Sequence, residues 1–266
     1  MKIEFFKYQG TGNDFIIFDG RASDFPIESF DPGVVQSICH RRFGIGADGV
    51  IILRPSRDFD FYMHYYNSDG HPGSMCGNGS RCLVDLAHRL GHIEEITAFE
   101  ASDGPHKAHV EPGKIAVLMN AGEPRSLSPH EYFIDTGSPH FIRYVDRIDD
   151  VDVVEEGRRV RNSPEYREEG VNVNFIHEIS PEEIEIATYE RGVEDETLSC
   201  GTGVTAAALI HMHRHNKAHG IIHIRAKGGN LDVEVKRSAG GSQEAWLIGP
   251  ATMVYKGVID IVTNSN

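Results

Sequence analysis

The sequence predicts an α/β protein built from two similar halves, each with strands around one main helix. Short apolar or alternating segments typical of strands fill most of the chain, and helical patterns separate them. A Cys-Gly-x-Gly motif occurs once in each half, as Cys76-Gly77-Asn78-Gly79 and as Cys200-Gly201-Thr202-Gly203. Each motif opens directly into a helical pattern. A repeat of this length indicates two tandem copies of a domain, not a solenoid.

The first half alternates strands with two helices. Residues 32–41 carry apolar side chains on one helical face, and residues 79–90 do so more clearly before Gly91 provides a stop. Strands are expected at residues 2–9, 15–19, 50–54, 59–66, 96–101 and 114–119. The turn-forming residues 120–129 lack periodicity, so we expect the boundary there, with domains at 1–121 and 122–253.

The second half repeats this theme with a single strong helix from Gly203. Residues 204–212 of this helix are nearly all apolar or small, so we expect burial on every side. Residues 158–161 mix arginine with flanking glutamates and read as a solvated turn. Strands are expected at residues 132–135, 141–145, 171–177, 184–189, 221–226, 231–235 and 245–248.

Composition narrows the class of protein. The formal net charge of −14 argues against nucleic acid or an acidic membrane as the main partner. No apolar run is long enough to span a bilayer, and the N-terminus reads as a strand with charged alternation, not a signal peptide. Four cysteines without such a signal fit thiols in a reducing cytoplasm. These features indicate a cytoplasmic enzyme or binding protein.

The Cys-Gly-x-Gly motif places a thiol beside the unpaired N–H groups of a helix start. The helix dipole there favours the thiolate, and the same N–H groups can hold a carboxylate. Glycine at the second and fourth positions is expected to let the backbone approach a ligand closely. One thiolate and one opposing thiol could take a proton from one face of a carbon and deliver another to the opposite face. The product would be an inverted stereocentre.

Other roles for a cysteine pair fit less well. A redox pair is usually Cys-x-x-Cys, and a zinc site needs further ligands around each thiol. A cysteine protease would leave the second motif unexplained. The histidine-rich residues 211–215 suggest a metal at first sight, but their alternate spacing is expected to scatter the rings around the helix. We therefore expect no metal.

The order of several motifs resembles the diaminopimelate epimerase family along the whole chain. They are Gly10-Thr11-Gly12-Asn13-Asp14-Phe15, Gly44-Ile45-Gly46-Ala47-Asp48-Gly49, Asn67-Ser68-Asp69-Gly70, Met75-Cys76-Gly77-Asn78-Gly79-Ser80-Arg81-Cys82, Gly137-Ser138-Pro139-His140, Val171-Asn172-Val173-Asn174-Phe175, Glu190-Arg191-Gly192 and Ser199-Cys200-Gly201-Thr202-Gly203. The resemblance implies an isomerase that interconverts LL- and meso-2,6-diaminopimelate, in lysine and peptidoglycan precursor biosynthesis. It also implies two pseudo-symmetric domains, each a strongly curved mixed or antiparallel sheet wrapped around a central helix. The final strand, about 254–266, would return to the first domain. The family uses no pyridoxal phosphate, other cofactor or metal, and its members usually form homodimers.

Carried over by position, the resemblance implies a set of site residues. Cys76 and Cys200 would be the acid and base, tuned by His140 and Glu190. The reacting carboxylate would be held by Gly77 with Asn78 and by Gly201 with Thr202. The remaining substrate-binding residues would be Asn13, Asn67, Asn172, Glu190 for an ammonium and Arg191 for the distal carboxylate.

Two positions depart from the family pattern, and two other functions stay open. Ser138 stands where several members carry Asn, and Gly49 stands where some bind substrate through Gln. A related cofactor-independent racemase or isomerase of another small carboxylate would share the thiol pair. A non-catalytic binding protein on the same fold is the alternative from another class.

Overall fold

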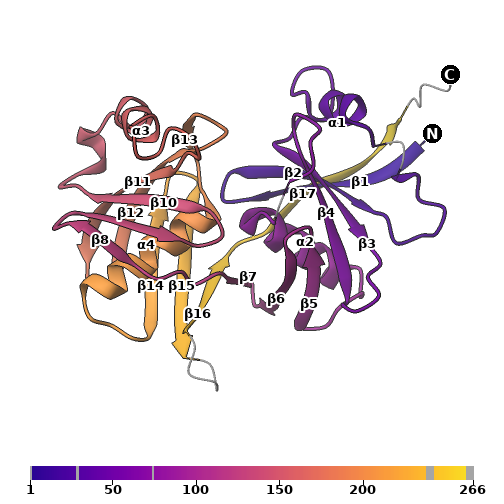
Figure 1. Ribbon diagram of the computed structural model, residues 1–266. Helices are drawn as coiled ribbons and strands as arrows, with labels where there is room; N and C mark the ends of the chain where they lie inside the picture. The colour runs from indigo at the N-terminus through magenta and orange to yellow at the C-terminus, as the bar shows by residue number, and fades with distance from the viewer. Residues whose placement is uncertain (1, 28–29, 74, 238–242, 262–266) are drawn as a thin grey trace. The chain divides into compact units, whose positions relative to one another are not determined.

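The chain folds into two compact units (Figure 1). The computed structural model describes residues 2–27, 30–73, 75–237 and 243–261. The first unit comprises Met1–Val117 together with Pro250–Asn266, and the second comprises Leu118–Gly249. Each unit is a curved mixed sheet with a long helix packed against it, which confirms the expected α/β class.

The described residues of the first unit contain two α-helices and strands β1–β7, and the unit boundary falls within β7. Strand β17, the last described strand, joins this unit. The bounds are β1 Lys2–Gly10, β2 Asn13–Asp19, α1 Pro32–Cys39, β3 Gly49–Arg54, β4 Phe61–Asn67, α2 Gly77–Arg89, β5 Ile96–Ala101, β6 Gly104–Glu111, β7 Lys114–Met119 and β17 Thr252–Asp260.

The second unit also contains two α-helices in its described residues. The bounds are β8 Arg125–Ser128, β9 Glu131–Asp135, β10 Pro139–Tyr144, a 3₁₀ turn Ile148–Asp150, α3 Val153–Arg161, β11 Asn172–Ser180, β12 Glu183–Glu190, β13 Asp195–Thr197, α4 Gly201–Arg214, β14 Gly220–Ala226, β15 Gly229–Arg237 and β16 Gln243–Gly249.

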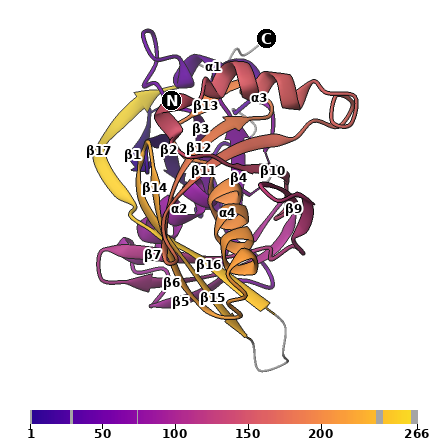
Figure 2. The same ribbon diagram turned by 90° about the vertical axis from the view of Figure 1, so that its left-hand side faces the viewer.

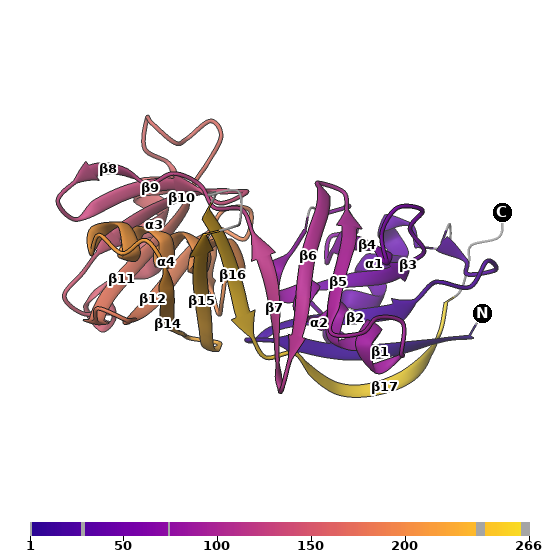
Figure 3. The ribbon, with the colours of Figure 1, turned by 90° about the horizontal axis from the view of Figure 1, so that it is seen from below.

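The two units share one connectivity. In the first, β1 is antiparallel to β2, α1 crosses over to the parallel strand β3, β4 returns antiparallel, and α2 leads to β5, which is parallel to β4. In the second, β9, β10, α3, β11, β12, α4 and β14 follow the same scheme. Each series ends in an antiparallel meander, β5–β6–β7 (Figure 3) or β14–β15–β16. This shared order is what internal duplication predicts.

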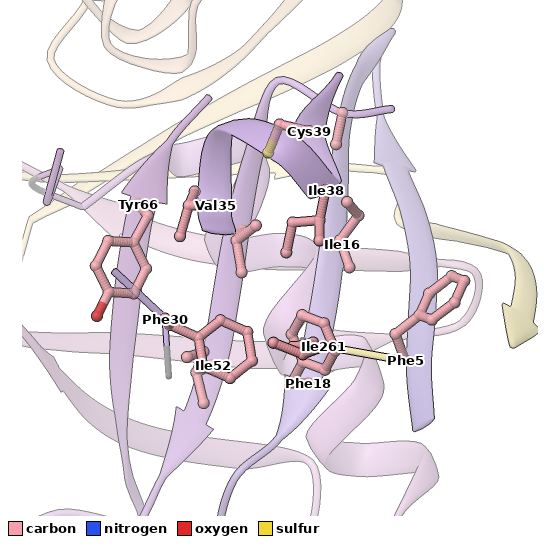
Figure 4. Packing of buried hydrophobic residues seen from close by; sticks show 12 residues of the cluster. Phe5, Ile16, Phe18, Phe30, Val35, Ile38, Cys39, Ile52, Tyr66 and Ile261 are labelled. Atoms are coloured by element: carbon pink, nitrogen blue, oxygen red, sulfur yellow. The ribbon is translucent and has the colours of Figure 1, made fainter. Parts of the chain in front are cut away.

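The central strands of the first unit are buried on both faces. Successive side chains of a strand point to opposite faces, so Ile16 and Ile52 pack with Val35 of α1 (Figure 4) while Phe15 and Ile51 lie against α2. Helix α2 also packs against β1, β6 and β17. Strands buried on both faces read as continuous apolar runs, which is why the sequence revealed β2 and β3 clearly.

Helix α3 covers one face of the second unit in the way that α1 covers the first. It begins at Asp152, whose side chain accepts a 2.9 Å hydrogen bond from Glu155 N. Its buried residues Val153 and Val160 pack with strand residues that include Tyr189. The expected solvated turn at residues 158–161 is therefore wrong: the arginines there lie on a helix whose other face is apolar.

Helix α4 lies on the other face of this sheet, against β9–β12 and β14–β16. All its residues from Val204 to Met212 are buried, which confirms the expectation from their apolar or small side chains. Both α2 and α4 begin two residues earlier than expected, because the motif glycines Gly77 and Gly201 are already helical. Figure 1 shows α4 among the strands of its own unit.

Other differences from expectation lie in polar segments. Residues 120–129, expected to be turn-forming throughout, include β8, which pairs antiparallel with β9. Strands β6 and β13 were not expected, because their polar side chains give no apolar alternation. Strand β17 lies beside β1 (Figures 2 and 3) and pairs with it antiparallel. The register places Lys2 opposite Asp260. The expected strand residues 262–266 lie outside the described part of the chain. No described helix is long and apolar enough to cross a membrane.

Candidate active site

Cys76 and Cys200 occupy the same position in the two units, immediately before a central helix. Cys76 is the N-cap of α2, with φ −109° and ψ 119°, and Cys200 is the N-cap of α4, with φ −115° and ψ 114°. Their carbonyl groups accept the first helical hydrogen bonds, from Ser80 N at 2.7 Å and Val204 N at 2.8 Å. Neither first turn carries an acidic residue. Each thiol therefore lies at a helix N-terminus whose dipole favours negative charge.

The other two cysteines have a different environment. Burial raises the pKa of Cys39 to about 12 and also raises the pKa of Cys82. Both side chains are therefore protonated at neutral pH and pack as small apolar groups. Only the two motif cysteines combine a helix N-terminus with a position at the edge of a sheet.

In the first unit, Asn13 lies beside the Cys76 thiol. Its Oδ1 is 3.7 Å from Cys76 Sγ and 3.4 Å from Asn78 Nδ2. Its Nδ2 donates a 2.6 Å hydrogen bond to Asp48 Oδ2. Because Asp48 takes the amide N–H, the carbonyl oxygen of Asn13 is directed toward the cysteine. Asp48, a member of the second family motif, is therefore a positioning residue.

A fully buried arginine lies behind this helix start. Arg81 donates hydrogen bonds to Asn78 Oδ1 at 3.0 Å, Thr11 Oγ1 at 3.1 Å and Pro250 O at 3.3 Å, and its Nη1 has no partner among the described residues. These partners are neutral oxygens. Burial lowers the pKa of Arg81 while the thiols of Cys82 and Cys76 raise it, but a guanidinium remains charged. Arg81 thus places a buried positive charge near Cys76, and its contacts hold the Asn78 side chain, 2% exposed, inside the unit.

Asn67 and Gly49 lie at the same sheet edge of the first unit, opposite each other on β4 and β3. Asn67 is exposed at the end of its strand. A Cβ on Gly49 would lie 2.6 Å from both Cε2 of Tyr65 and the carbonyl oxygen of Tyr66. The neighbouring strand therefore fills the space that a longer side chain at position 49 would need.

In the second unit, Cys200 is 8% exposed and its Sγ is 3.4 Å from Thr202 Oγ1. The carbonyl of Thr202 accepts a 2.9 Å hydrogen bond from Thr136 Oγ1, which ties the first turn of α4 to the end of β9. The thiol and the hydroxyl of the motif are thus adjacent within one helix start, as Cys76 and Asn78 are in the first unit.

His140 lies beneath the first turn of α4 and is fully buried. Asn174 Nδ2 donates to its Nδ1 at 3.1 Å, so the ring proton is on Nε2, which has no partner among the described residues. Thr188 fixes the Asn174 amide by donating to its Oδ1 at 2.9 Å. Burial, with a smaller contribution from Arg191, lowers the pKa of His140 to about 3. His140 is therefore neutral at physiological pH and supports the helix start from behind.

The fourth glycine of each motif has a packing role. A Cβ on Gly203 would lie 2.6 Å from Asn174 Oδ1, and a Cβ on Gly79 would lie 2.9 Å from Ile51 Cδ1. Ordinary van der Waals contact would be longer. Both glycines therefore admit side chains of their own unit, a packing role that stands beside the expected close approach of a ligand.

Asn172 and Arg191 converge at the edge of the second sheet. Asn172 Oδ1 accepts a 2.9 Å hydrogen bond from Arg191 N, and its Nδ2 donates to Ser138 Oγ at 2.8 Å. The Arg191 guanidinium reaches Ser138 Oγ at 3.4 Å and Glu169 O at 2.8 Å. Ser138 thus links the two residues. Glu190 precedes Arg191 as the last residue of β12.

These placements bring the expected residues into two clusters, one in each unit. The first contains Asn13, Asn67, Cys76, Gly77 and Asn78, and the second contains His140, Asn172, Glu190, Arg191, Cys200, Gly201 and Thr202. In the first unit β2 and β3 begin, and β4 ends, at the edge where α2 begins. In the second unit β10 and β11 begin, and β12 ends, at the edge where α4 begins. Asp48, Arg81, Ser138 and Asn174 were quoted in the motifs but gained roles only from their hydrogen bonds.

The fold defines a class of two-unit α/β proteins in which each unit wraps a sheet around a central helix. A phenazine biosynthesis protein of the PhzF family from Bacillus anthracis has this fold, with a TM-score of 0.74, 14% identity, and coverage of 98% of this chain and 100% of that chain. A probable proline racemase from Agrobacterium radiobacter K84 matches with a TM-score of 0.68 and 15% identity, over 99% of this chain and 94% of that chain.

The sequence relatives identify the family within this class. The family model described as diaminopimelate epimerase matches residues 5–127 and 132–254. The diaminopimelate epimerase of Flavobacterium psychrophilum is 43% identical, covering 97% of this chain and 100% of that protein. That of Chlorobaculum tepidum is 40% identical, covering 95% and 99%. This chain belongs to the diaminopimelate epimerase family, which confirms the resemblance stated from the motifs.

Proposed function

We propose that this protein interconverts LL- and meso-2,6-diaminopimelate by cofactor-independent, two-base proton transfer through Cys76 and Cys200. Lysine and peptidoglycan precursor biosynthesis would use this reaction. The observation that carries the proposal is the same cysteine N-cap in both units of a chain from this family. We further propose that the two units are the pseudo-symmetric domains of the enzyme.

The chemistry follows from a thiolate and a thiol on opposite faces of the substrate's α-carbon. The thiolate takes the α-proton: an S–H bond forms, and the C–H electron pair stays on the carbon. Negative charge then spreads into the adjacent carboxylate, where helix N–H groups stabilise it as it develops. The opposite thiol delivers its proton to the other face, and the stereocentre is inverted. The two cysteines exchange protonation states in each turnover, so the reaction is reversible.

The polar groups of each cluster bind the rest of the substrate. The guanidinium of Arg191 suits bidentate recognition of the distal carboxylate, with Ser138 and Asn172 holding it in place. Glu190 suits the ammonium group. In the first unit, Asn13 and Asn67 supply amide groups without charge.

Solvent isotope incorporation tests the proposal directly. With LL-diaminopimelate in deuterated water, the meso product should carry deuterium at one α-carbon. Cys76→Ala and Cys200→Ala should each lower kcat by at least about 10³-fold, because each removes an acid or base that touches the substrate. Cys39→Ala, at a buried cysteine outside the clusters, is the matched control. Label-free turnover, or full activity in either motif variant, would overturn the mechanism.

Substrate identity is tested at Arg191. Arg191→Ala should raise KM for diaminopimelate at least about tenfold with little change in stability, whereas Arg225→Ala, at an exposed ion pair of the same unit, should not. An unchanged KM would remove Arg191 from substrate binding. Turnover of a different small carboxylate in place of diaminopimelate would favour the related racemase, and no turnover at all would favour a binding protein.

We also propose that the enzyme is a homodimer and acts in the cytoplasm. Acid–base catalysis needs both motif cysteines reduced, which a reducing compartment maintains. Light scattering on the purified protein at micromolar concentration measures its mass, and a monomeric mass would contradict the dimer.

A further inference from the structure

The C-terminal end of α4 brings two histidines together with a glutamate from β11. His211 and His215 are four residues apart, so they lie on one face of the helix. One ligand atom from each of these histidines and one from Glu178 all lie within 4.8 Å of one another. His215 Nε2 is 3.0 Å from Glu178 Oε1. The expectation that the histidines of residues 211–215 share no face is therefore wrong, since it considered only the alternate spacing.

The two imidazole rings carry nitrogens that the described structure leaves without a hydrogen-bond partner. His211 is fully buried, its Nδ1 is 3.1 Å from the hydroxyl of Tyr144, and its Nε2 has no partner. His215 Nε2 is buried as well and also lacks one, because its contact with Glu178 does not have hydrogen-bond geometry. A buried polar nitrogen without a partner is costly and calls for an explanation. A cation bound between the two rings would be the missing partner of both nitrogens.

The surroundings suit a metal ligand at His211. Its hydrogen bond with Tyr144 leaves Nε2 as the nitrogen that can coordinate, which is the usual way in which an outer hydrogen bond orients a ligating imidazole.

We propose that Glu178, His211 and His215 form a binding site for a divalent transition-metal ion, with zinc as the ion that best fits. Two imidazoles and one carboxylate are ligands that zinc accepts in tetrahedral sites. The side chains of His215 and Glu178 are 26% and 32% exposed, so water can complete the coordination and the ion can enter from solvent.

The proposed site is structural. His211 follows Cys200 by about 16 Å along the helix at 1.5 Å per residue, too far for an ion there to touch a substrate at the thiol. An ion would tie the last turn of α4 to the far end of β11. The near ends of these elements carry Cys200 and Asn172. The ion would therefore hold the helix of one reacting thiol against the strand that supports Arg191.

Metal binding to the chelator-treated, full-length protein tests the proposal. Titration with zinc chloride, followed by calorimetry, should show one ion per chain and a rise in Tm. His215→Gln and Glu178→Gln should each weaken binding at least tenfold, because each removes a ligand from a partly exposed position. His213→Gln, on the same helix but outside the cluster, should leave the affinity and the Tm rise unchanged.

The visible spectrum of bound cobalt(II) distinguishes binding at this site from binding at the thiols. Bound at the proposed site, it should show visible d–d bands without an intense thiolate charge-transfer band, and His215→Gln should abolish those bands. Absence of binding, equal affinity in all the variants, or a cobalt spectrum dominated by thiolate bands would each overturn the proposal. Circular dichroism of the variants confirms that they are folded. None of these outcomes depends on epimerase activity.

Discussion

The buried His140 makes a quantitative prediction about stability at low pH. Its side chain is fully buried, and its Nδ1 accepts a hydrogen bond from Asn174. The variant His140→Asn keeps a hydrogen-bond acceptor close to the position of Nδ1 but cannot gain a proton in this pH range. The space left by the rest of the ring destabilises the variant by the same amount at every pH. Any difference in pH dependence from the wild type therefore reports the titration of His140 alone.

The size of the effect follows from the two pKa values. The pKa of His140 is about 3 in the folded protein, against 6.5 for an unperturbed histidine. Between these values the unfolded chain binds a proton that the folded chain does not. The free energy of unfolding is therefore unaffected above pH 6.5 and falls as the pH drops below it. At about 1.4 kcal/mol per pKa unit, the loss between about pH 8 and about pH 5 is about 2 kcal/mol.

Urea unfolding at these two pH values measures the loss. Trp246, the single tryptophan, lies on β16 in the same unit as His140, so its fluorescence follows the unfolding of that unit. The wild type should lose about 2 kcal/mol more than His140→Asn between the two pH values. The exposed His213→Asn should behave as the wild type does. Equal pH dependence in the wild type and in His140→Asn would refute the reasoning, because His140 would then titrate in the folded state as it does in the unfolded chain.

Two further variants test the helix starts. Gly203→Ala places a Cβ 2.6 Å from Asn174 Oδ1, so it should destabilise the second unit by about 1–3 kcal/mol in urea unfolding, while Gly33→Ala, exposed in the first turn of α1, should cost less than about 0.5 kcal/mol. Equal costs would remove the packing role of Gly203. Arg81→Met removes the buried charge near Cys76 and should lower kcat/KM at neutral pH at least about tenfold, with the acid limb of the pH–rate profile moved upward. If Arg81→Met lowers stability but leaves the profile in place, the guanidinium acts on folding alone.

The sequence revealed the apolar parts of the fold better than the polar parts. Strands β5 and β7 lie at the expected residues, because their apolar side chains alternate or run continuously. Helix α3 was missed because its arginines and glutamates outnumber Val153 and Val160. Only the packing of these valines with Tyr189 shows which face of the helix is buried. Strand β8 was missed because its residues carry a turn-like composition and gain their hydrogen bonds from β9.

Some features of the candidate site also follow from the sequence, and others need the tertiary structure. The motif cysteines and their helix starts follow from the sequence, because a Cys-Gly-x-Gly before an apolar periodicity is a local signal. The packing role of the fourth glycine does not follow from the sequence, because the side chains next to it come from strands distant in the chain. The clustering of Glu178 with His211 and His215 does not follow from the sequence either, because it needs the register of β11 against α4.

The sequence by itself determined the class of the fold, the duplication, the family and the two cysteines, because these rest on periodicity and on motifs whose residues are close in the chain. The tertiary structure decided which polar groups are buried, which of them hold Cys76 and Cys200 in position, and where histidine and glutamate meet. Burial and hydrogen bonding depend on contacts between segments far apart in sequence, and those contacts exist only once the strands have paired and the helices have packed.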